Sequence, residues 1–199
     1  FRQVLSALEF AHGHMIIHRD IRPSNILISE EDNIKITDFG TSTLLNDRQY
    51  ATTKIGSPPY MAPEQFEGRA VLASDIYSAG CLFYEMVSGL PPIVMANPME
   101  IYKKAKSSDF VPLIKKVPAL SPELNRIISR TLDPDFKKRY QKVGEVINDL
   151  NEKFFQYRSV IVGVPALAQV SVDQHKRMIE ALRGKDLSTL RDLVRELAP

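Results

Sequence analysis

Residues 74–87 constrain the fold most, because a helix there would have no side suited to solvent. The segment reads SDIYSAGCLFYEMV, and its apolar and small residues cover most of a helical surface. A helix that is apolar on nearly every side is stable only when other elements surround it. Gly89, followed by Pro91 and Pro92, is a typical signal for the end of such a helix. The chain is therefore expected to fold around one buried central helix.

Amphipathic segments that could cover this helix occur on both sides of it. Apolar side chains recur at helical spacing in four segments, namely 1–13, 98–106, 121–132 and 142–154. Ser121 followed by Pro122 is a favoured beginning for the third of these helices. The pattern predicts a mainly helical body.

A small β element and a long loop interrupt this pattern. The β-rich runs 25–29 and 34–37 flank the polar turn EEDN, which predicts a β-hairpin. Residues 38–64 are rich in Gly, Pro, Ser and Thr and lack periodicity. A loop of this length is uncommon in a compact domain unless it is functional. The expected fold class is mainly α, formally α+β, with one small hairpin.

The composition is that of an ordinary soluble protein. Apolar residues make up 44% and charged residues 25%, and the formal net charge is +2. This balance argues against a nucleic-acid partner recruited by bulk charge. The single cysteine, Cys81, allows no internal disulfide and suits a reducing compartment. The apolar stretch 160–170 is shorter than the roughly 20 residues that a membrane span needs. We therefore expect a cytoplasmic protein with no membrane span in this chain.

Chemistry is concentrated around the predicted hairpin. The loop HRDIRPSN carries Asp20 and Asn25 before the first strand, and Asp38 follows the second strand. Because a hairpin brings its outer ends together, Asn25 and Asp38 are expected to converge. Amide and carboxylate oxygens suit Mg²⁺, which takes its other ligands from phosphates and water. Asp20 could then orient a nucleophilic hydroxyl, and Arg22 could face the transferred anion. This is a phosphoryl-transfer site in outline.

The motifs HRDIRPSN, DFG and APE occur in the order and spacing of the protein-kinase catalytic loop, metal-binding motif and activation-segment end. GSPPYMAPEQ, DIYSAGCLFYEMVSGLPP and LDPDFKKRY resemble the kinase segments that follow. Residues 1–153 therefore resemble the C-terminal lobe of a serine/threonine protein kinase, and 154–199 are expected to form a C-terminal helical extension. A glycine-rich loop, a strand lysine and a helix glutamate are not found in the sequence, so the resemblance implies a missing N-terminal kinase lobe as a partner.

The resemblance also implies ATP and Mg²⁺ as cofactors and a protein substrate with a serine or threonine acceptor. Asp20 matches the catalytic aspartate, and Asn25 and Asp38 match the two magnesium ligands. Arg22 stands where serine/threonine kinases usually have Lys, a change that keeps the charge but alters its geometry. Leu27 matches the aliphatic residue beneath adenine.

Five further residues match structural positions of the family. His18 and Phe39 match members of the packed column that signals an active arrangement. Asp75 matches the aspartate that hydrogen-bonds the catalytic-loop backbone. Glu64 and Arg139 match a buried ion pair, in which the loss of one partner strands the charge of the other.

Regulation is expected at the long loop. Arg19 precedes the catalytic aspartate, where the resemblance implies contact with a phosphate on the activation segment. Thr53, three positions before Gly56, is the preferred phosphate acceptor, and Thr52 is the next. The alternative is that both threonines are unmodified. His12 and His14 near a helix end are expected to be polar surface residues.

The alternative function is a non-catalytic interaction module that resembles a pseudokinase. The presence of Asp20, Asn25 and Asp38 favours an enzyme, because a scaffold has no chemical use for all three. Without the glycine loop and the lysine, residues 1–199 alone are expected to bind MgATP weakly and to show no turnover.

Overall fold

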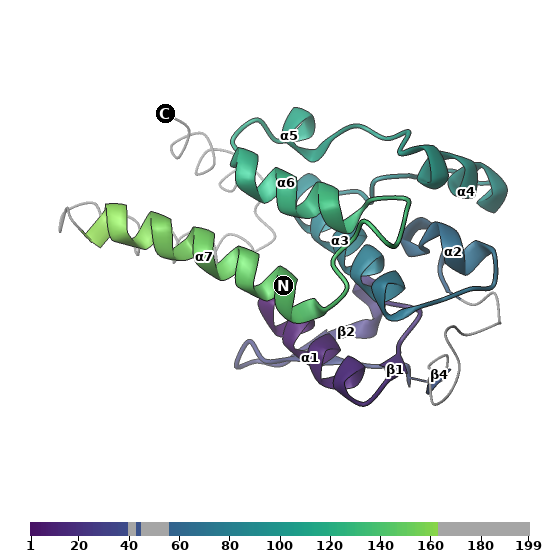
Figure 1. Ribbon diagram of the computed structural model, residues 1–199, viewed down its shortest axis with the longest axis horizontal. Coiled ribbons are helices and arrows are strands. Elements are labelled where there is room, and N and C mark those ends of the chain that lie inside the picture. Colours follow the sequence, from purple (N-terminus) through teal and green to yellow (C-terminus); the bar gives the residue numbers. More distant parts are fainter. Residues whose placement is uncertain (40–42, 45–55, 163–199) are drawn as a thin grey trace. The chain divides into compact units, whose positions relative to one another are not determined.

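A computed structural model describes residues 1–39, 43–44 and 56–162, with side chains described in 1–39 and 56–152 (Figure 1). The contacts divide the chain into two compact units, Phe1–Leu150 and Asn151–Pro199. Within the described ranges, no helix has the length and apolar character required to cross a membrane. Thr52, Thr53 and the helices expected after residue 162 lie outside the described residues.

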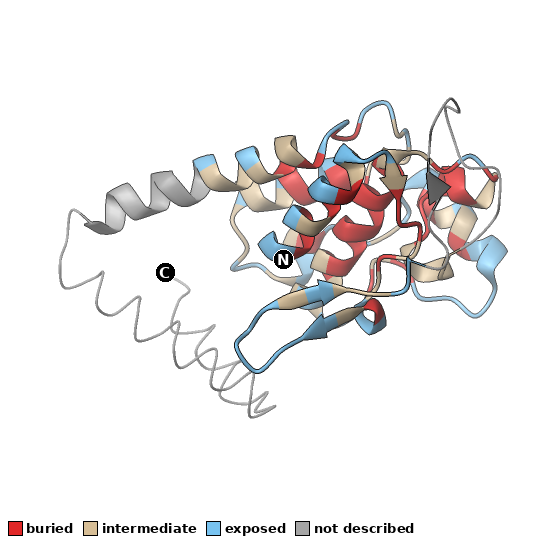
Figure 2. Cartoon of the chain, turned by 90° about the horizontal axis from the view of Figure 1, so that it is seen from below, coloured by how far each residue is buried: buried red, intermediate tan, exposed pale blue. Residues whose placement is uncertain are grey.

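The central element is helix α3, Leu72–Ser88, which begins two residues before the predicted segment. It is buried along most of its length, as Figure 2 shows in red. The helix ends at Gly89, whose φ of 85° is left-handed and whose N–H donates to the carbonyl of Glu85. Glycine adopts this conformation without the steric cost that a Cβ brings, so the predicted stop has a clear physical cause.

Three helices cover one side of α3 in the first unit. They are α1 (Arg2–Gly13), α6 (Pro122–Thr131) and the first turns of α7 (Val143–Val162). Their apolar side chains join those of α3 in one cluster that includes Leu5, Leu8, Ile76, Ile127 and Val146. Ser121 accepts a hydrogen bond from the Leu124 N–H and so caps α6 as predicted.

The other side of α3 packs against shorter elements. These are the 3₁₀ turn η3 (Pro58–Tyr60), α2 (Pro63–Phe66), α4 (Pro98–Ser107) and α5 (Leu113–Lys116). Their cluster contains Tyr77, Cys81, Tyr84, Ile101 and Leu113. Burial raises the pKa of the Cys81 thiol, which makes this cysteine a packing residue rather than a nucleophile.

The predicted hairpin consists of β2 (Ile26–Ile28) and β3 (Ile34–Ile36). The strands are antiparallel and pair Ile26 with Ile36 and Ile28 with Ile34. A 3₁₀ turn, η1 (Pro23–Asn25), leads into β2. Leu27 and Ile28 are 56% and 70% exposed, and because they are consecutive residues of one strand their side chains point to opposite faces of the hairpin.

The long segment 38–64 contains more structure than the predicted loop. Within it, β4 (Thr43–Leu44) pairs antiparallel with β1 (Ile16–Ile17), and η3 and the start of α2 follow. Strands of two residues are too short to produce a period in the sequence, and η3 and α2 are single turns. Helical periodicity could therefore not reveal them.

Helix α7 continues to residue 162, beyond the predicted end near 154. The apolar spacing weakens after Phe154, but the chain contains no Gly or Pro until Gly163 and Pro165. Because no breaker residue occurs between Phe154 and Val162, the helix can continue past the predicted end.

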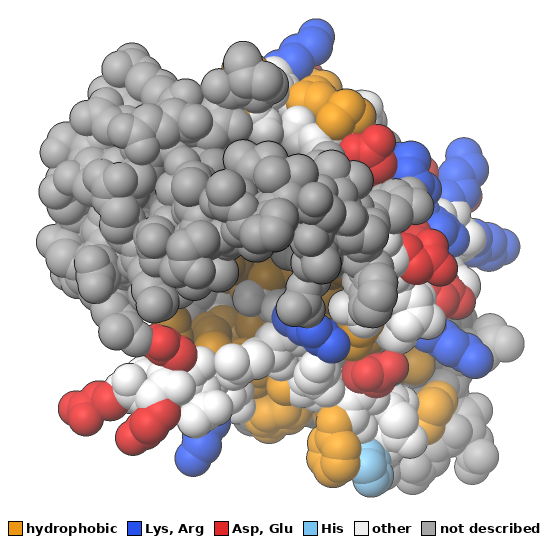
Figure 3. Space-filling view, turned by 90° about the vertical axis from the view of Figure 1, so that its left-hand side faces the viewer, with side chains coloured by type: hydrophobic (Ala, Val, Ile, Leu, Met, Phe, Trp, Pro, Cys, Tyr) orange, Lys and Arg blue, Asp and Glu red, His pale blue; other side chains and the backbone are white. Residues whose placement is uncertain are grey.

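Charges of both signs lie among hydrophobic side chains on the face shown in Figure 3. The exposed hydrophobic residues of the described part include Phe10 at 73% and Phe39 at 46%.

Candidate functional site

The loop 18–25 is attached to the central helix by the carboxylate of Asp75, in the first turn of α3. Oδ2 of Asp75 accepts from the His18 N–H, and Oδ1 accepts from the Arg19 N–H, both at 2.8 Å. The imidazole Nε2 of His12 lies 2.9 Å from Oδ2. Because the Asp75 side chain is fully buried, these bonds are shielded from water. The loop backbone is thus positioned by the core of the fold.

The expectation that His12 is a surface residue is wrong. Its side chain is only 8% exposed, whereas His14 is exposed and contacts the carbonyl of Phe10. His12 follows Leu8 by four residues and Leu5 by seven, so all three lie on the buried face of α1. This helical spacing was the signal in the sequence that could have identified it.

Both ring nitrogens of His18 bond to the protein. Nε2 lies 2.9 Å from the carbonyl of Thr37, which can only accept, so Nε2 carries the proton. Nδ1 then accepts from the Asp20 N–H at 3.3 Å. The ring also packs edge-on against Phe39, with ring centroids 4.7 Å apart. His18 therefore joins the catalytic-loop candidate to the segment after β3 and has no free nitrogen to act as a base.

The Asp20 carboxylate is held by two donors. Oδ1 accepts from the backbone N–H of Ser57 at 2.9 Å, and Oδ2 accepts from the Asn25 amide nitrogen at 3.1 Å. The same Asn25 nitrogen donates to the Asp20 carbonyl at 2.8 Å. These bonds orient the Asn25 side chain and leave its oxygen, which has only a long contact of 3.4 Å with the Ser24 hydroxyl, available for a cation.

The hairpin brings Asp38 to the same end as Asn25. The N–H of Thr37 donates to the Asn25 carbonyl at 2.9 Å, so Asp38 follows directly after this link. Asp38 is exposed and has a left-handed φ of 63°. Its carboxylate and the Asn25 amide are oxygen donors of the kind that Mg²⁺ prefers. Among the described residues, no group of three His, Cys, Asp or Glu side chains could hold a metal ion.

Arg22 links the loop to the segment that precedes α2. Its Nε donates to the hydroxyl of Ser24, and one terminal nitrogen donates to the hydroxyl of Ser57. Ser57 therefore contacts Arg22 through its side chain and Asp20 through its backbone. The planar guanidinium can make both bonds at once, whereas a lysine ammonium has no such fixed fork.

The carbonyl of Arg19 bonds to the Gln65 side chain and lies close to the backbone of Gly56. The Gln65 side chain donates to the Arg19 carbonyl at 2.9 Å. A Cβ on Gly56, whose φ is 136°, would lie 2.8 Å from that carbonyl oxygen. Burial lowers the pKa of Arg19, and the charge of Asp75 partly offsets this effect. Gln65 was not among the residues predicted from the sequence, in which its position after APE was the only signal.

Glu64 and Arg139 form a buried ion pair. Two guanidinium nitrogens of Arg139 donate to the two Glu64 oxygens at 2.6 and 2.8 Å. The Glu64 carboxylate also accepts from the Ser74 hydroxyl at 2.7 Å, and the guanidinium lies 4.8 Å from the centre of the Tyr77 ring. The pair ties α2 to the segment before α7.

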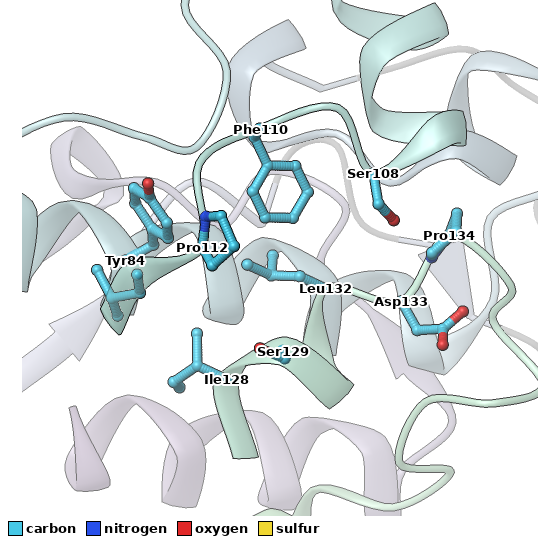
Figure 4. A pocket seen from close by; sticks show the side chains of 10 residues that line it. Tyr84, Ser108, Phe110, Pro112, Ile128, Ser129, Leu132, Asp133 and Pro134 are labelled. Carbon is cyan, nitrogen blue, oxygen red and sulfur yellow. The ribbon is translucent and has the colours of Figure 1, made fainter. Parts of the chain in front are cut away.

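Two cavities are lined by residues other than Asp20, Asn25 and Asp38. One, of about 220 Å³, lies between α3, α6 and the segment after α4, and Figure 4 shows Phe110 and Pro112 facing Leu132 across it. No residue predicted to be functional lines it. The second, of about 480 Å³, is lined by His12 and residues of the first turns of α7.

Comparison with known proteins gives a consistent result. A family model described as "Protein kinase domain" matches residues 1–154. Serine/threonine-protein kinase PknB of Mycolicibacterium smegmatis is 38% identical over 149 residues, which cover 72% of this chain and 24% of that protein. Probable serine/threonine-protein kinase PknB of Bifidobacterium longum is 37% identical over 152 residues, 74% of this chain and 22% of that protein.

A relative from a eukaryote is equally similar. Probable serine/threonine-protein kinase nek2 of Dictyostelium discoideum is 38% identical over 141 residues, or 69% of this chain and 33% of that protein. The matched part of this chain thus spans between a fifth and a third of the length of these relatives.

Proposed function

Because this chain belongs to the protein kinase family, we propose that it forms the part of a MgATP-dependent phosphoryl-transfer site that holds the metal and the acceptor hydroxyl. The observation that carries this proposal is the position of the Asp20 carboxylate between the Ser57 N–H and the Asn25 amide. Asp38 lies at the same end of the hairpin. Two acidic groups and one amide thus gather at one edge of the fold.

The roles follow from the bonds that each group already makes. Asp20 is the catalytic carboxylate, which orients a serine or threonine hydroxyl and accepts its proton. Asn25 and Asp38 bind the Mg²⁺ that accompanies the phosphates of ATP, because their oxygens are not committed to strong bonds. Leu27, exposed on β2, contacts the adenine. Bound MgATP would supply the phosphoryl group, and its metal ion would neutralise the negative charge that develops during transfer.

Arg22 is the group that faces the transferred phosphate. Its contacts with Ser24 and Ser57 keep the guanidinium beside Asp20 before substrate arrives. A preorganised positive charge stabilises negative charge that develops during transfer. We therefore expect Arg22→Lys to lower turnover more than it weakens binding of MgATP.

Turnover requires a second lobe that carries a glycine-rich loop and a lysine for the ATP phosphates. The acceptor is a serine or threonine of a protein, and we place the reaction in the cytoplasm, where ATP is abundant and the reduced thiol of Cys81 is stable. Thr53 or Thr52 accepts a regulatory phosphate that pairs with Arg19 and orders the segment before Gly56.

The test is a phosphoryl-transfer assay on the full-length natural protein with radiolabelled ATP, Mg²⁺ and a serine- and threonine-containing protein substrate. Asp20→Asn and Asp38→Asn should each abolish transfer, whereas only Asp38→Asn should weaken binding of MgATP. Glu30→Gln, on the exposed turn of the hairpin, is the matched control and should leave transfer unchanged.

Different outcomes separate the alternatives. If the wild type transfers phosphate and the Asp20→Asn variant does so equally well, the proposed role of Asp20 is refuted. Binding of MgATP without transfer by the full-length protein would favour the non-catalytic interaction module. Robust turnover by residues 1–199 alone would refute the requirement for a second lobe. Phosphopeptide mapping of active protein that finds neither Thr52 nor Thr53 modified would remove the regulatory proposal.

A further inference from the structure

Gln65 is a fully buried polar side chain close to the catalytic-loop candidate. It is the third residue of α2 and has no exposed surface. Its Oε1 accepts from the Ala62 N–H at 3.0 Å, and its Nε2 donates to the Arg19 carbonyl at 2.9 Å. A backbone N–H can only donate and a carbonyl can only accept, so these partners fix which end of the amide is which. The side chain therefore joins α2 to the loop that carries Asp20.

Capping of α2 explains only one of these two bonds. The bond to the Ala62 N–H is the half of a capping box that the third helical residue supplies. A Glu would supply it equally well, and its charge would suit the helix N-terminus. An ionised Glu cannot donate to the Arg19 carbonyl, whereas the amide of Gln can. The contact with the loop thus accounts for the amide at position 65.

The Arg19 carbonyl belongs to the peptide group that leads into Asp20. The other end of that group, the Asp20 N–H, donates to Nδ1 of His18 at 3.3 Å. With the carbonyl held by Gln65, both polar ends of this peptide have a partner in the fold. Because a peptide group is planar, holding both ends fixes its plane and the position of the next Cα. Gln65 and His18 together therefore set the direction in which the Asp20 side chain leaves the backbone.

The backbone at Arg19 requires such support. Arg19 has a left-handed φ of 71°, which residues with a Cβ rarely adopt and which persists only where surrounding contacts hold it. Its N–H is held by Asp75, and its carbonyl is held by Gln65. Gly56 leaves room for the second contact, since a Cβ there would lie 2.8 Å from the carbonyl oxygen and 3.3 Å from the Gln65 amide nitrogen.

We propose that Gln65 is a positioning residue for phosphoryl transfer, which orients the Asp20 carboxylate by holding the Arg19 carbonyl. This role rests on the proposed function and adds a residue to it. The segment 56–65 holds Asp20 at two points, because the Ser57 N–H donates to its carboxylate and Gln65 holds the peptide before it. Contact of this segment with the loop thus sets the orientation of the catalytic carboxylate.

Gln65→Met tests this role in the full-length natural protein, because Met has a similar length and no amide. In folded molecules kcat should fall about tenfold to a hundredfold, as when a reacting group is displaced by about 1 Å, and the KM for ATP should change by less than about twofold. Circular dichroism identifies a temperature at which the wild type and the variant are both folded, and the rates are compared there. A merely structural role would lower the melting temperature and leave kcat of the folded molecules unchanged.

Gln3 provides a matched control, since this exposed side chain makes the same two kinds of bond at another place. Its amide nitrogen donates to the Asp32 carbonyl at 3.1 Å, and its oxygen accepts from the Ile34 N–H at 2.8 Å. Gln3→Met should change kcat by less than about twofold.

Hydrogen–deuterium exchange adds a measurement that requires no turnover. Gln65→Met should speed exchange in residues 18–25, because the peptide before Asp20 loses a partner. Gln3→Met should speed exchange in residues 26–36 and leave residues 18–25 unchanged.

Gln65→Glu separates the two bonds. Either form of the carboxyl can accept from the Ala62 N–H, but only the protonated form can donate to the Arg19 carbonyl. Burial raises the pKa of a carboxyl, so the proton is kept at low pH and lost as pH rises. Relative to wild type, kcat of this variant should be close to normal near about pH 5.5 and about tenfold lower near about pH 8.5. Because both bonds are kept at low pH, this variant tests the role even if Gln65→Met does not fold.

Three results would overturn the proposal. They are a kcat within about twofold of wild type in folded Gln65→Met, exchange in residues 18–25 that matches wild type, and a kcat ratio of Gln65→Glu to wild type that stays constant while the carboxyl titrates. Absence of transfer by the wild type would instead refute the proposed function, and exchange in residues 18–25 would then decide whether Gln65 holds the loop.

Discussion

Replacing Arg139 with Met should strongly destabilise the first compact unit, because it leaves the Glu64 carboxylate charged in the interior. The side chain of Arg139 has no exposed surface and that of Glu64 has 4%. Met has a similar apolar stem, so the contact with Tyr77 is largely kept and the lost interactions are polar. Glu64 retains only the hydroxyl of Ser74 as a donor among the bonds described above.

The expected cost is about 3–5 kcal/mol, the range found when one partner of a buried ion pair is removed. The carbonyls of Asp133 and Ala73, which accept from Arg139 at 2.6 and 3.1 Å, also lose a donor. In a chain of this length each kcal/mol lowers the melting temperature by about 2–4 °C, so the decrease should be about 6–20 °C. Thermal and urea unfolding followed by circular dichroism would measure it.

Two further variants make the reasoning specific. Arg126→Met removes an exposed charge from α6 and should change the free energy of unfolding by less than about 0.5 kcal/mol. Glu64→Gln combined with Arg139→Met should be more stable than Arg139→Met alone, since no stranded charge remains. A loss below about 1 kcal/mol for Arg139→Met, the value of a surface pair, would refute the buried-pair interpretation.

Three other perturbations test separate parts of the structure. Asp75→Ala leaves the buried N–H groups of His18 and Arg19 without their acceptor. Urea unfolding should show that the free energy of unfolding falls by about 1–3 kcal/mol for each N–H group, and an unchanged midpoint would contradict the anchoring role. Gly56→Ala places a Cβ 2.8 Å from the Arg19 carbonyl at a φ of 136° and should cost about 1–3 kcal/mol, whereas Gly13→Ala should not. The third perturbation is a change of pH acting on Glu67. Hydrogen bonds from Lys106, Arg69 and Tyr102, with that from Lys106 the largest effect, lower the pKa of the Glu67 carboxyl from 4.5 to about 2. Its contribution to stability is therefore present above pH 4.5 and lost as pH falls toward 2, so the melting temperatures of wild type and Glu67→Gln should converge over this window; a constant difference would refute the assignment.

The longer helices and the end of α3 could be predicted because their causes are local. The segment 74–87 is apolar on most sides, and Gly89 supplies the left-handed residue that ends it. The hairpin followed from two β-rich runs around a polar turn. Single turns such as α2 and the two-residue strand Thr43–Leu44 could not be predicted, because they are too short to show a period and depend on contacts with distant segments.

The candidate site was predictable in part for the same reason. Asp20, Asn25 and Asp38 are close in sequence to one hairpin, and the hairpin alone brings their backbones to one end. The partners that hold them come from elsewhere. Ser57 contacts Asp20 from 37 positions away, and spacing along the chain contains no trace of that contact.

His12 shows where local reasoning ends. Its place on the apolar face of α1 was visible in the sequence, but its environment was not. Its bond to Asp75, its unpartnered Nδ1 and the cavity beside it arise only when α1, α3 and α7 meet.

The sequence by itself determined the buried central helix, the hairpin and the motifs of a protein kinase lobe, because periodicity, breaker residues and motif order are properties of neighbouring residues. Only the tertiary structure decided which donors hold the Asp20 carboxylate and the buried pair, and where a second cavity opens. Those features depend on side chains that meet across tens of positions, whose separation is set by how the helices pack and not by any pattern along the chain.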